Sequence, residues 1–341
     1  MSEHLITALE GQVPFQDAPS SVVGTPDGSP RGWSVGLDVG GTKVLGVILD
    51  GTGAVRHEVR TPTVQGVDGV VGGVVDAVHD LVDRAGVAVE DLAGIGIGLP
   101  GVVDPRDGTV EHAVNLGIAD QVALGALVGS SLGTDLEVQV ENDLNVAALG
   151  AAHLADGPVA DLALLALGTG VAAGLVLDGR LRRGSTGAAG EIGHLTLVAD
   201  GLACKCGQAG CIEQYASGTA IDAAWPGPHS RPAPLELFDA ADAGDARAIE
   251  VRDQFAWAVA SAVRILVLTC DVEHVVIGGG VAGVGPRLLD AVRGVLEQEA
   301  TSSPFLASMK IAERVSLVPA GVPVGAVGAA LAGRQAAEGV H

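Results

Sequence analysis

Three cysteines and one histidine that lie close together in the sequence have side chains able to bind a soft metal ion. They follow the spacing His-x9-Cys-x-Cys-x4-Cys, and Gly207 and Gly210 permit a tight chain path before the last cysteine. One imidazole and three thiolates form the ligand set of a closed, tetrahedral zinc site, which fixes a loop and does not polarise substrate. The alternative is a chance grouping of cysteines in a glycine-rich loop. The sequence therefore predicts a structural Zn²⁺ site with four ligands, which are His194, Cys204, Cys206 and Cys211.

Four apolar runs that we expect to be strands end in glycine-rich turns. Residues without a Cβ let backbone N–H groups approach phosphate oxygens closely. In a chain with 51 glycines one such turn is weak evidence, but four at strand ends favour a nucleotide site. The chain has neither a Walker loop nor the dinucleotide-binding fingerprint. The turns are Asp-Val-Gly-Gly-Thr-Lys at 38–43, Gly-Leu-Pro-Gly at 98–101, Gly-Thr-Gly at 168–170 and Gly-Gly-Gly at 278–280.

A carboxylate that can act as a base follows another apolar run. Transfer of a phosphoryl group to a hydroxyl needs a group that accepts the proton as the oxygen attacks. Asp143 comes directly after an expected strand at 136–140 and just before an expected helix, so its side chain can face a cleft. An aspartate at this place is also a common helix N-cap. From the residues alone, both interpretations of Asp143 stay open.

The pattern of apolar residues predicts an α/β protein with two similar halves. Runs at 34–39, 44–49 and 55–61, separated by tight turns, predict three antiparallel strands. Residues 67–85 carry apolar side chains at helical spacing, and a strand follows at 94–98. The second half repeats this order loosely, which indicates an internal duplication. Its expected strands are 162–167, 172–177 and 275–277, and its expected helices are 247–267 and 286–298. The Ala-rich segment 325–337 is an expected helix that returns to the first domain.

Composition and charge exclude several classes of protein. With 41 Asp and Glu against 19 Lys and Arg, the net charge of −22 argues against a nucleic-acid partner. The longest uncharged runs, 162–177 and 315–333, contain Gly-Thr-Gly or two prolines, so we expect buried strands and turns and no membrane span. The N-terminus lacks the pattern of a signal peptide, and Cys270 lies alone in an apolar segment as an expected core residue. We therefore expect a cytoplasmic protein.

The chain is long enough for about two domains. Residues 1–33 contain several prolines and no sustained period, so we expect a flexible N-terminal tail. A smaller α/β domain is expected from residues 34–140 plus 325–341. A larger α/β domain, with the zinc loop, is expected from residues 141–324.

An ordered set of motifs resembles the ROK family (repressors, open reading frames, kinases) within the actin-like ATPase superfamily. The resemblance spans about residues 34–335 and is specific as a set. It implies an actin-like ATPase (ribonuclease H-like) fold, duplicated into two α/β domains with a cleft between them. The matching motifs are the first phosphate motif at 37–43, the sugar-domain turn at 98–104, the catalytic segment at 141–145, the second phosphate motif at 167–170, the sugar and metal segment at 190–194 and the adenosine motif at 277–280.

The resemblance also implies an activity and the residues that perform it. It implies an ATP-dependent kinase that transfers the γ-phosphate to the 6-hydroxyl of glucose or a glucose-like hexose, with Mg²⁺ and a structural Zn²⁺. Asp143 is then the catalytic base, and Asp38 orients the hydration shell of the magnesium ion. A homo-oligomer is also implied. The implied substrate-binding residues are Asn142, Glu191, His194, Glu213 and Gly101, and the implied nucleotide-binding residues are Asp38, Gly40, Gly41, Thr42, Lys43, Gly168, Thr169, Gly170, Gly278, Gly279 and Gly280.

The sequence departs from the family pattern near two of these motifs. Ala172 and Ala173 stand where the family usually has two glycines, and Leu144 replaces a small alanine beside Asp143. The sugar is therefore left open, and a kinase for an amino sugar (kanosamine, N-acetylglucosamine or N-acetylmannosamine) is the alternative. A non-catalytic sugar-binding or sugar-sensing ROK protein is the alternative of another class. A regulator of this kind needs a DNA-binding domain, which the Pro-rich first 33 residues do not supply.

Overall fold

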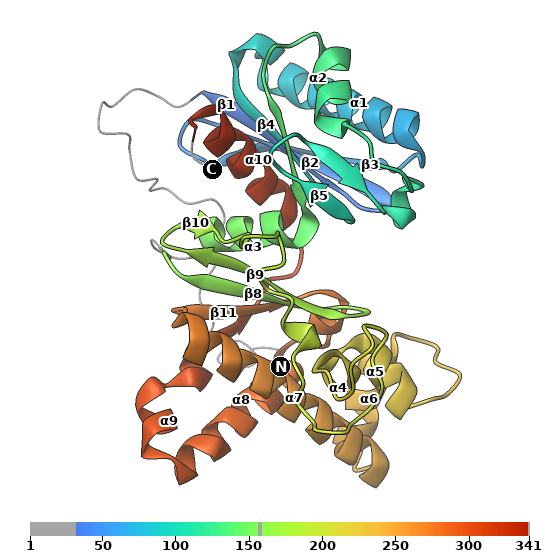
Figure 1. Cartoon of the computed structure of the whole chain (residues 1–341), viewed down its shortest axis with the longest axis vertical. Coiled ribbons are helices and arrows are strands. Elements are labelled where there is room, and N and C mark those ends of the chain that lie inside the picture. The colour runs from blue at the N-terminus through green and yellow to red at the C-terminus, as the bar shows by residue number, and fades with distance from the viewer. Residues whose placement is uncertain (1–31, 156–158, 340–341) are drawn as a thin grey trace, which may run out of the picture. The chain divides into compact units, whose positions relative to one another are not determined.

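The computed structural model describes residues 32–155 and 159–339, which fall into two compact units (Figure 1). The first unit contains residues 32–155, 179–187 and 321–339, and the second contains residues 159–178 and 188–320. Of the expected N-terminal tail, residues 1–31 lie outside the described residues. The expected domain boundary after residue 140 falls inside strand β7 (Val138–Asn142). This strand pairs with β4 (Leu92–Leu99) and thus belongs to the first unit.

The first unit is built on a five-stranded sheet with the order β3-β2-β1-β4-β7. The strands β1 (Trp33–Val39), β2 (Lys43–Leu49) and β3 (Val55–Pro62) pair antiparallel, as the tight turns between them predict. Strands β4 and β7 add in parallel to β1. Because helices cover both faces of the sheet, β2 and β4 are apolar and buried along almost their whole length. The covering helices are α1 (Val67–Ala85) and α2 (Leu124–Leu132) on one face and α3 (Asp143–Leu154) and α10 (Val324–Ala337) on the other.

Glycines in the sheet let helix α10 lie directly against the strands. A Cβ at Gly36 would lie 2.1 Å from the carbonyl oxygen of Ala326, and one at Gly96 would lie 1.8 Å from that of Ala329. Such distances leave no room for any side chain. The contact brings the first turn of α10 to Asp38, because a Cβ at Gly325 would lie 2.7 Å from Oδ2 of Asp38.

The second unit repeats the strand arrangement of the first. Its strands β8 (Leu162–Leu167), β9 (Val171–Leu177), β11 (His274–Gly278) and β12 (Val315–Leu317) lie in the order β9-β8-β11-β12. The β8–β9 pair is antiparallel and the other two pairs are parallel, as in the series β2-β1-β4-β7. This repetition confirms the prediction of an α/β fold with two similar halves.

Helix α7 (Ala246–Cys270) forms much of the core of the second unit, together with α6 (Ala233–Asp242) and α8 (Pro286–Ser302). Among the described residues it is the one helix long and apolar enough to cross a membrane, judged by length and composition. In the structure its apolar side chains pack against the sheet and the neighbouring helices. Its apolar character is thus accounted for by burial inside the protein.

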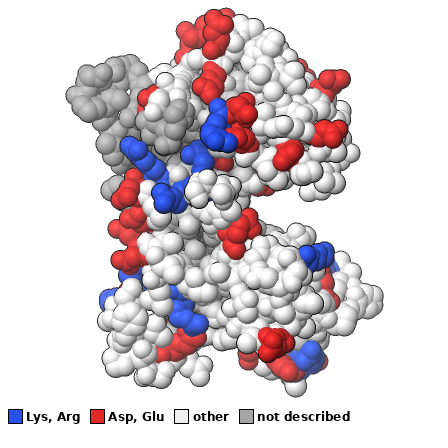
Figure 2. Space-filling view, viewed as in Figure 1, with Lys and Arg blue, Asp and Glu red and all other residues white. Residues whose placement is uncertain are grey.

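The remaining elements are short. They are the strands β5 (Val102–Asp104), β6 (Thr109–Glu111) and β10 (Arg180–Leu181), the helices α4 (Glu213–Ala216), α5 (Gly218–Ala224) and α9 (Pro304–Met309), and 3₁₀ turns at Val89–Asp91, Val114–Leu116, Ile192–His194, Gly280–Val284 and Ile311–Arg314. Asp and Glu side chains are spread over the visible face of each unit, while Lys and Arg occur at fewer places (Figure 2). This distribution agrees with the net charge of −22.

Candidate functional site

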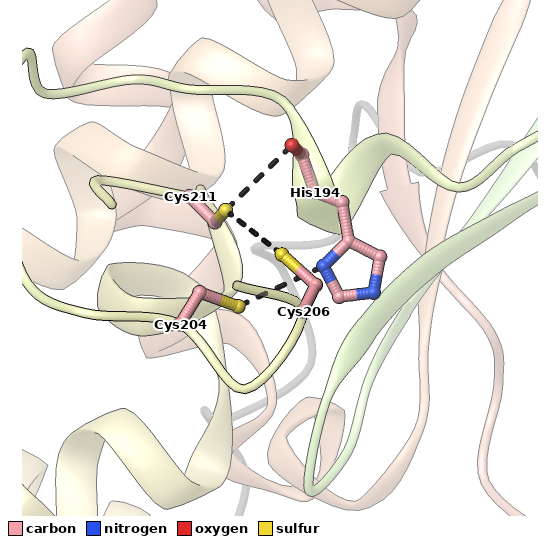
Figure 3. Close-up of side chains that lie close together, drawn as sticks. All are labelled: His194, Cys204, Cys206 and Cys211. Carbon is pink, nitrogen blue, oxygen red and sulfur yellow. Dashed lines mark hydrogen bonds between the residues drawn. The ribbon is translucent and has the colours of Figure 1, made fainter. Parts of the chain in front are cut away.

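The four predicted zinc ligands lie together in the second unit (Figure 3). Their donor atoms all lie within 4.8 Å of one another. Nδ1 of His194 is 3.8 Å from Sγ of Cys204, and Sγ of Cys206 is 3.7 Å from Sγ of Cys211. One ring nitrogen and three sulfurs that converge on one point fit a tetrahedral Zn²⁺ ion with no open coordination position.

Hydrogen bonds and burial give the thiols of this loop different acidities. Hydrogen bonds from the backbone and the side chain of Gln208 lower the pKa of the Cys206 thiol to about 6. Burial raises the pKa of the Cys211 thiol to about 12. The side-chain amide of Gln208 also donates to the carbonyl oxygen of His194 at 3.2 Å, which links the cysteine-containing part of the loop to His194. The loop is therefore held by its own hydrogen bonds in the form that brings the ligands together.

His194 has a second polar neighbour besides the thiols. Its Nε2 lies 3.9 Å from Oε2 of Glu191, whose side chain is exposed. A histidine that binds a metal through one ring nitrogen is commonly oriented by a carboxylate at the other. Two of the residues expected to bind the sugar, Glu191 and His194, are thus neighbours in the structure.

Glu213, at the start of α4, contacts the second phosphate turn. Its Oε2 accepts a hydrogen bond from the backbone N–H of Val171 at 3.1 Å, and a Cβ at Gly170 would lie only 2.4 Å from that oxygen. The turn is also held from the segment that follows, because Gly218 N–H donates to Gly168 O and Thr219 Oγ1 donates to Thr169 O. The chain just after the zinc loop therefore fixes the Gly-Thr-Gly turn.

A cavity of about 600 Å³ adjoins this turn within the second unit. Thr169 and Gly170 line one side of it, and Phe255 and Gln254 of α7 line another. A volume in this range suits a small organic ligand. The lining combines apolar side chains, such as Phe255, with polar ones, such as Gln254 and Thr219.

Ala172 and Ala173, which replace two glycines of the family pattern, lie inside β9 and not in the phosphate turn. They pair with Ala166 and Leu165 of β8. Ala173 donates its N–H to Gly190 O at 2.8 Å. Added methyl groups at these two places thus leave the backbone N–H groups of the Gly-Thr-Gly turn unaltered.

The second glycine-rich turn of this unit follows β11. Gly279 has a φ of +85°, and a Cβ there would lie 2.5 Å from the carbonyl oxygen of Leu167. Only glycine fits both the left-handed backbone and this close approach. The turn at 278–280 therefore lies beside the end of β8, next to the start of the Gly-Thr-Gly turn.

Asp38 lies near the end of β1 in the first unit, just before the first phosphate turn. Gly40 donates its N–H to Lys43 O at 2.9 Å, which closes that turn, and the Lys43 side chain is exposed. Burial, and to a smaller extent the charge of Asp143, raises the pKa of Asp38 to about 6, while the charge of Lys43 acts in the opposite direction. A partly buried carboxylate beside a second one is a site that favours a cation.

Asp143 is the first residue of α3, and Asn142, the residue before it, is the N-cap of this helix. The side chain of Asn142 accepts the N–H of Leu144 at 3.0 Å as the N-cap, and Oδ1 of Asp143 accepts the same N–H at 2.8 Å. Burial raises the pKa of Asp143, and the hydrogen bond from Leu144 opposes the effect in part. The capping function that the sequence left open thus belongs to Asn142.

Gly101, expected at the sugar-domain turn, lies next to Asn142. Its φ is +123°, and a Cβ added there would lie 2.9 Å from Glu111 O, so the position requires glycine. Nδ2 of Asn142 donates to Gly101 O at 3.5 Å. The first unit therefore groups Asp38, Gly101, Asn142 and Asp143 at the carboxyl ends of β1, β4 and β7.

Two residues near this group were not singled out from the sequence. Glu141, on β7, is buried and paired with Arg183, which follows β10. Forty-two positions separate the two residues in the chain, and no local pattern links them. Only the structure reveals the pair.

Comparisons with known proteins agree with this geometry. Residues 34–334 match the model of the ROK family. A glucokinase from Halalkalibacterium halodurans is 36% identical over 76% of this chain and 84% of its own length. An N-acetyl-D-glucosamine kinase from Citrobacter koseri is 34% identical over 72% of this chain and 84% of its own length. The crystal structure of a ROK family glucokinase from Streptomyces griseus, in complex with glucose and AMPPNP, superposes with a TM-score of 0.65 at 31% identity. It covers 89% of this chain and 100% of its own.

Proposed function

Because the chain belongs to the ROK family, we propose that this sugar kinase transfers the γ-phosphate of ATP to the 6-hydroxyl of glucose or a glucose-like hexose. The observation that carries the proposal is the carboxylate of Asp143. It is partly buried at the start of α3, its pKa is raised, and it directly follows Asn142, which contacts the family's sugar-domain turn at Gly101. A relative of this chain with 31% identity binds glucose and an ATP analogue.

Asp143 acts as the general base. As the 6-hydroxyl oxygen of the sugar attacks the γ-phosphorus, a bond forms between them and the bond from that phosphorus to the bridging oxygen of ADP breaks. The hydroxyl proton passes to the Asp143 carboxylate. Because a raised pKa brings a carboxylate closer to neutral pH, burial makes Asp143 a better proton acceptor than an exposed aspartate.

Asp38 and the glycine turns bind the nucleotide. The backbone N–H groups at 40–43 and 168–170 donate hydrogen bonds to phosphate oxygens, and residues 278–280 lie along the adenosine. The partly buried pair of Asp38 and Asp143 fits Mg²⁺, which Asp38 would hold through its hydration shell. When bound, Mg²⁺ supplies charge neutralisation to the phosphates. Lys43 adds positive charge at the same turn.

The residues that bind the sugar hydroxyls are Asn142, Glu191, His194 and Glu213. When a bound sugar covers these polar groups, one that lacks the matching hydroxyl leaves them unpaired and is rejected. The zinc ligands His194, Cys204, Cys206 and Cys211 would fix the loop that presents His194 and leads into Glu213.

A second candidate substrate is N-acetylglucosamine. The relative from Citrobacter koseri, named for that sugar, is nearly as similar to this chain as the glucokinase is. Kanosamine and N-acetylmannosamine belong to the same group of amino-sugar candidates. A non-catalytic sugar-binding protein is disfavoured, because Ala172 and Ala173 lie in a strand and leave the phosphate turn intact.

The deciding experiment measures ADP release from MgATP with glucose, mannose, fructose, kanosamine, N-acetylglucosamine and N-acetylmannosamine. Turnover that is fastest with glucose supports the proposal, and preference for an acetylated sugar supports the second candidate. The same assay is run on Asp143→Asn, which lacks the proposed base. Asp290→Asn, which changes an exposed side chain on α8, is its matched control. Sugar binding with no turnover on any member of the panel would make the chain a binding protein.

We further propose that the protein is cytoplasmic and homo-oligomeric, as the resemblance to the family implies. Light scattering coupled to size-exclusion chromatography measures the mass directly. A mass of two or four chains supports the proposal, and a mass near 33.9 kDa contradicts it.

A further inference from the structure

A buried carboxylate next to Asp143 has no function in the proposed reaction. The side chain of Glu141 is only 3% exposed. Its Oε2 accepts a hydrogen bond from Nε of Arg183 at 2.5 Å. Its Oε1 accepts the backbone N–H of Asn142 at 3.0 Å and the side-chain amide of Asn145 at 2.8 Å. Burial of a carboxylate is costly unless its charge is paired and its oxygens accept hydrogen bonds, and here both conditions are met.

The partners of Glu141 flank Asp143 on both sides. Asn142 precedes it and caps α3, while Asn145 lies in the first turn of the same helix. One carboxylate oxygen therefore holds the chain before and after Asp143. This arrangement restricts rotation of the turn between β7 and α3, and thereby sets the direction of the Asp143 side chain.

Arg183 reaches Glu141 from a distant part of the chain. It lies in the segment 179–187, which follows β9, belongs to the first unit and leads directly to Glu191. The Arg183 side chain is 27% exposed, so the pair lies at the edge of the buried region. The guanidinium of Arg183 is the cationic partner that offsets the cost of burying the Glu141 side chain two residues before Asp143.

We propose that Glu141 and Arg183 form a positioning pair that holds Asp143 in the orientation needed for proton transfer. The inference rests on the proposed function of Asp143 as the base. Arg183 is then required for turnover although it lies outside every motif of the family. A pair with only a structural function would change the stability of the fold and leave the kcat of the folded enzyme unchanged.

The test compares Arg183→Met, Glu141→Gln and the double variant, assayed well below the Tm of each. We expect each single variant to lose roughly 10- to 100-fold in kcat, because a displacement of about 1 Å at a reacting group has this effect. The KM for the sugar and for ATP should change less than about threefold, since the binding groups stay in place. Arg183→Lys, which keeps the charge, should recover part of kcat.

The double variant gives an independent readout. Because the two side chains act as one unit, removing both should cost no more kcat than removing Arg183 alone. The double variant can still be assayed if Arg183→Met does not fold, because replacing both side chains leaves no unpaired buried charge. Arg56→Met is the matched control, because Arg56 forms an ion pair with Asp50 in the same unit but lies outside the site.

Two outcomes would overturn the inference alone. One is wild-type kcat in the folded Arg183→Met enzyme, and the other is independent, multiplying losses of kcat in the double variant. A wild-type protein that turns over none of the sugars would instead overturn the proposed function, and the inference with it.

Discussion

The carboxyl groups of Asp38 and Asp143 lie near enough to each other for the charge of Asp143 to contribute to raising the pKa of Asp38. Burial is the larger cause, and together they bring this pKa to about 6. Asp38 comes from the end of β1 and Asp143 from the start of α3, just after β7. The parallel pairing of β1, β4 and β7 brings them to the same edge of the sheet. The first unit thus builds a doubly acidic group at the place where the proposed reaction needs a cation and a base.

Asp143→Asn is expected to reduce kcat by roughly 10²- to 10⁴-fold, because it removes the group that accepts the hydroxyl proton. The amide oxygen of asparagine can still accept the N–H of Leu144, so the fold and the affinity for sugar should be retained. ADP release at saturating substrates measures the loss, and calorimetry measures sugar binding. Full activity in the variant would show that another group is the base.

Asp38→Asn is expected to remove a pH dependence of stability between about pH 4 and pH 6. In the wild type, Asp38 holds its proton up to a pKa of about 6 in the folded state, against 3.8 in the unfolded chain. The stabilisation is therefore complete below the unfolded value and is lost as the pH rises through the folded value. The rise in the pKa of Asp38 from 3.8 to about 6 corresponds to at most roughly 3 kcal/mol of the free energy of unfolding.

Urea unfolding at a series of pH values measures this effect as the difference between wild type and variant. Asp120→Asn, an exposed side chain in the same unit, serves as the control. Saturating Mg²⁺ should diminish the difference, because a cation near Asp38 stabilises the ionised form. A difference that is constant with pH would contradict the assignment.

Cys204→Ser is expected to abolish the binding of one zinc ion per chain, because a structural site needs all four ligands. Since metal binding contributes to folding, Tm should fall by on the order of 5 °C or more. Elemental analysis and thermal unfolding measure the two effects. Cys270→Ser is the matched control, since Cys270 lies at the end of α7, outside the cluster, and its variant should keep the metal.

Gly96→Ala and Gly72→Ala are expected to change stability in opposite directions. A methyl group at Gly96 would lie 1.8 Å from Ala329 O and push α10 off the sheet, at a cost of about 3 kcal/mol or more. Gly72 lies on the exposed face of α1 with nothing within 4 Å, so alanine there should stabilise by about 0.5–1 kcal/mol. Chemical unfolding measures the free energy of unfolding of both variants. Equal changes in the two variants would contradict the close packing of α10 against the sheet.

Much of the fold follows from local patterns in the sequence. The period of apolar residues places helices at 67–85 and 325–337 within a residue or two of α1 and α10, and the antiparallel strands follow from tight turns. The spacing of His194 and the three cysteines, together with their chemistry, identifies a group of side chains that could hold a metal ion, and the structure brings these side chains together. These features are readable because they depend on neighbours in the chain or on the chemistry of the side chains themselves.

The sequence by itself therefore determined the α/β architecture, the four candidate metal ligands and the motifs of the family. Tertiary structure alone decided the pairing of Glu141 with Arg183, the contact of Glu213 with the N–H of Val171 and the shifted pKa of Asp38. Each of these depends on burial, or on a partner that is more than 40 positions away. Solvent exclusion and long-range proximity are properties of the packed chain, and no local pattern of residues encodes them.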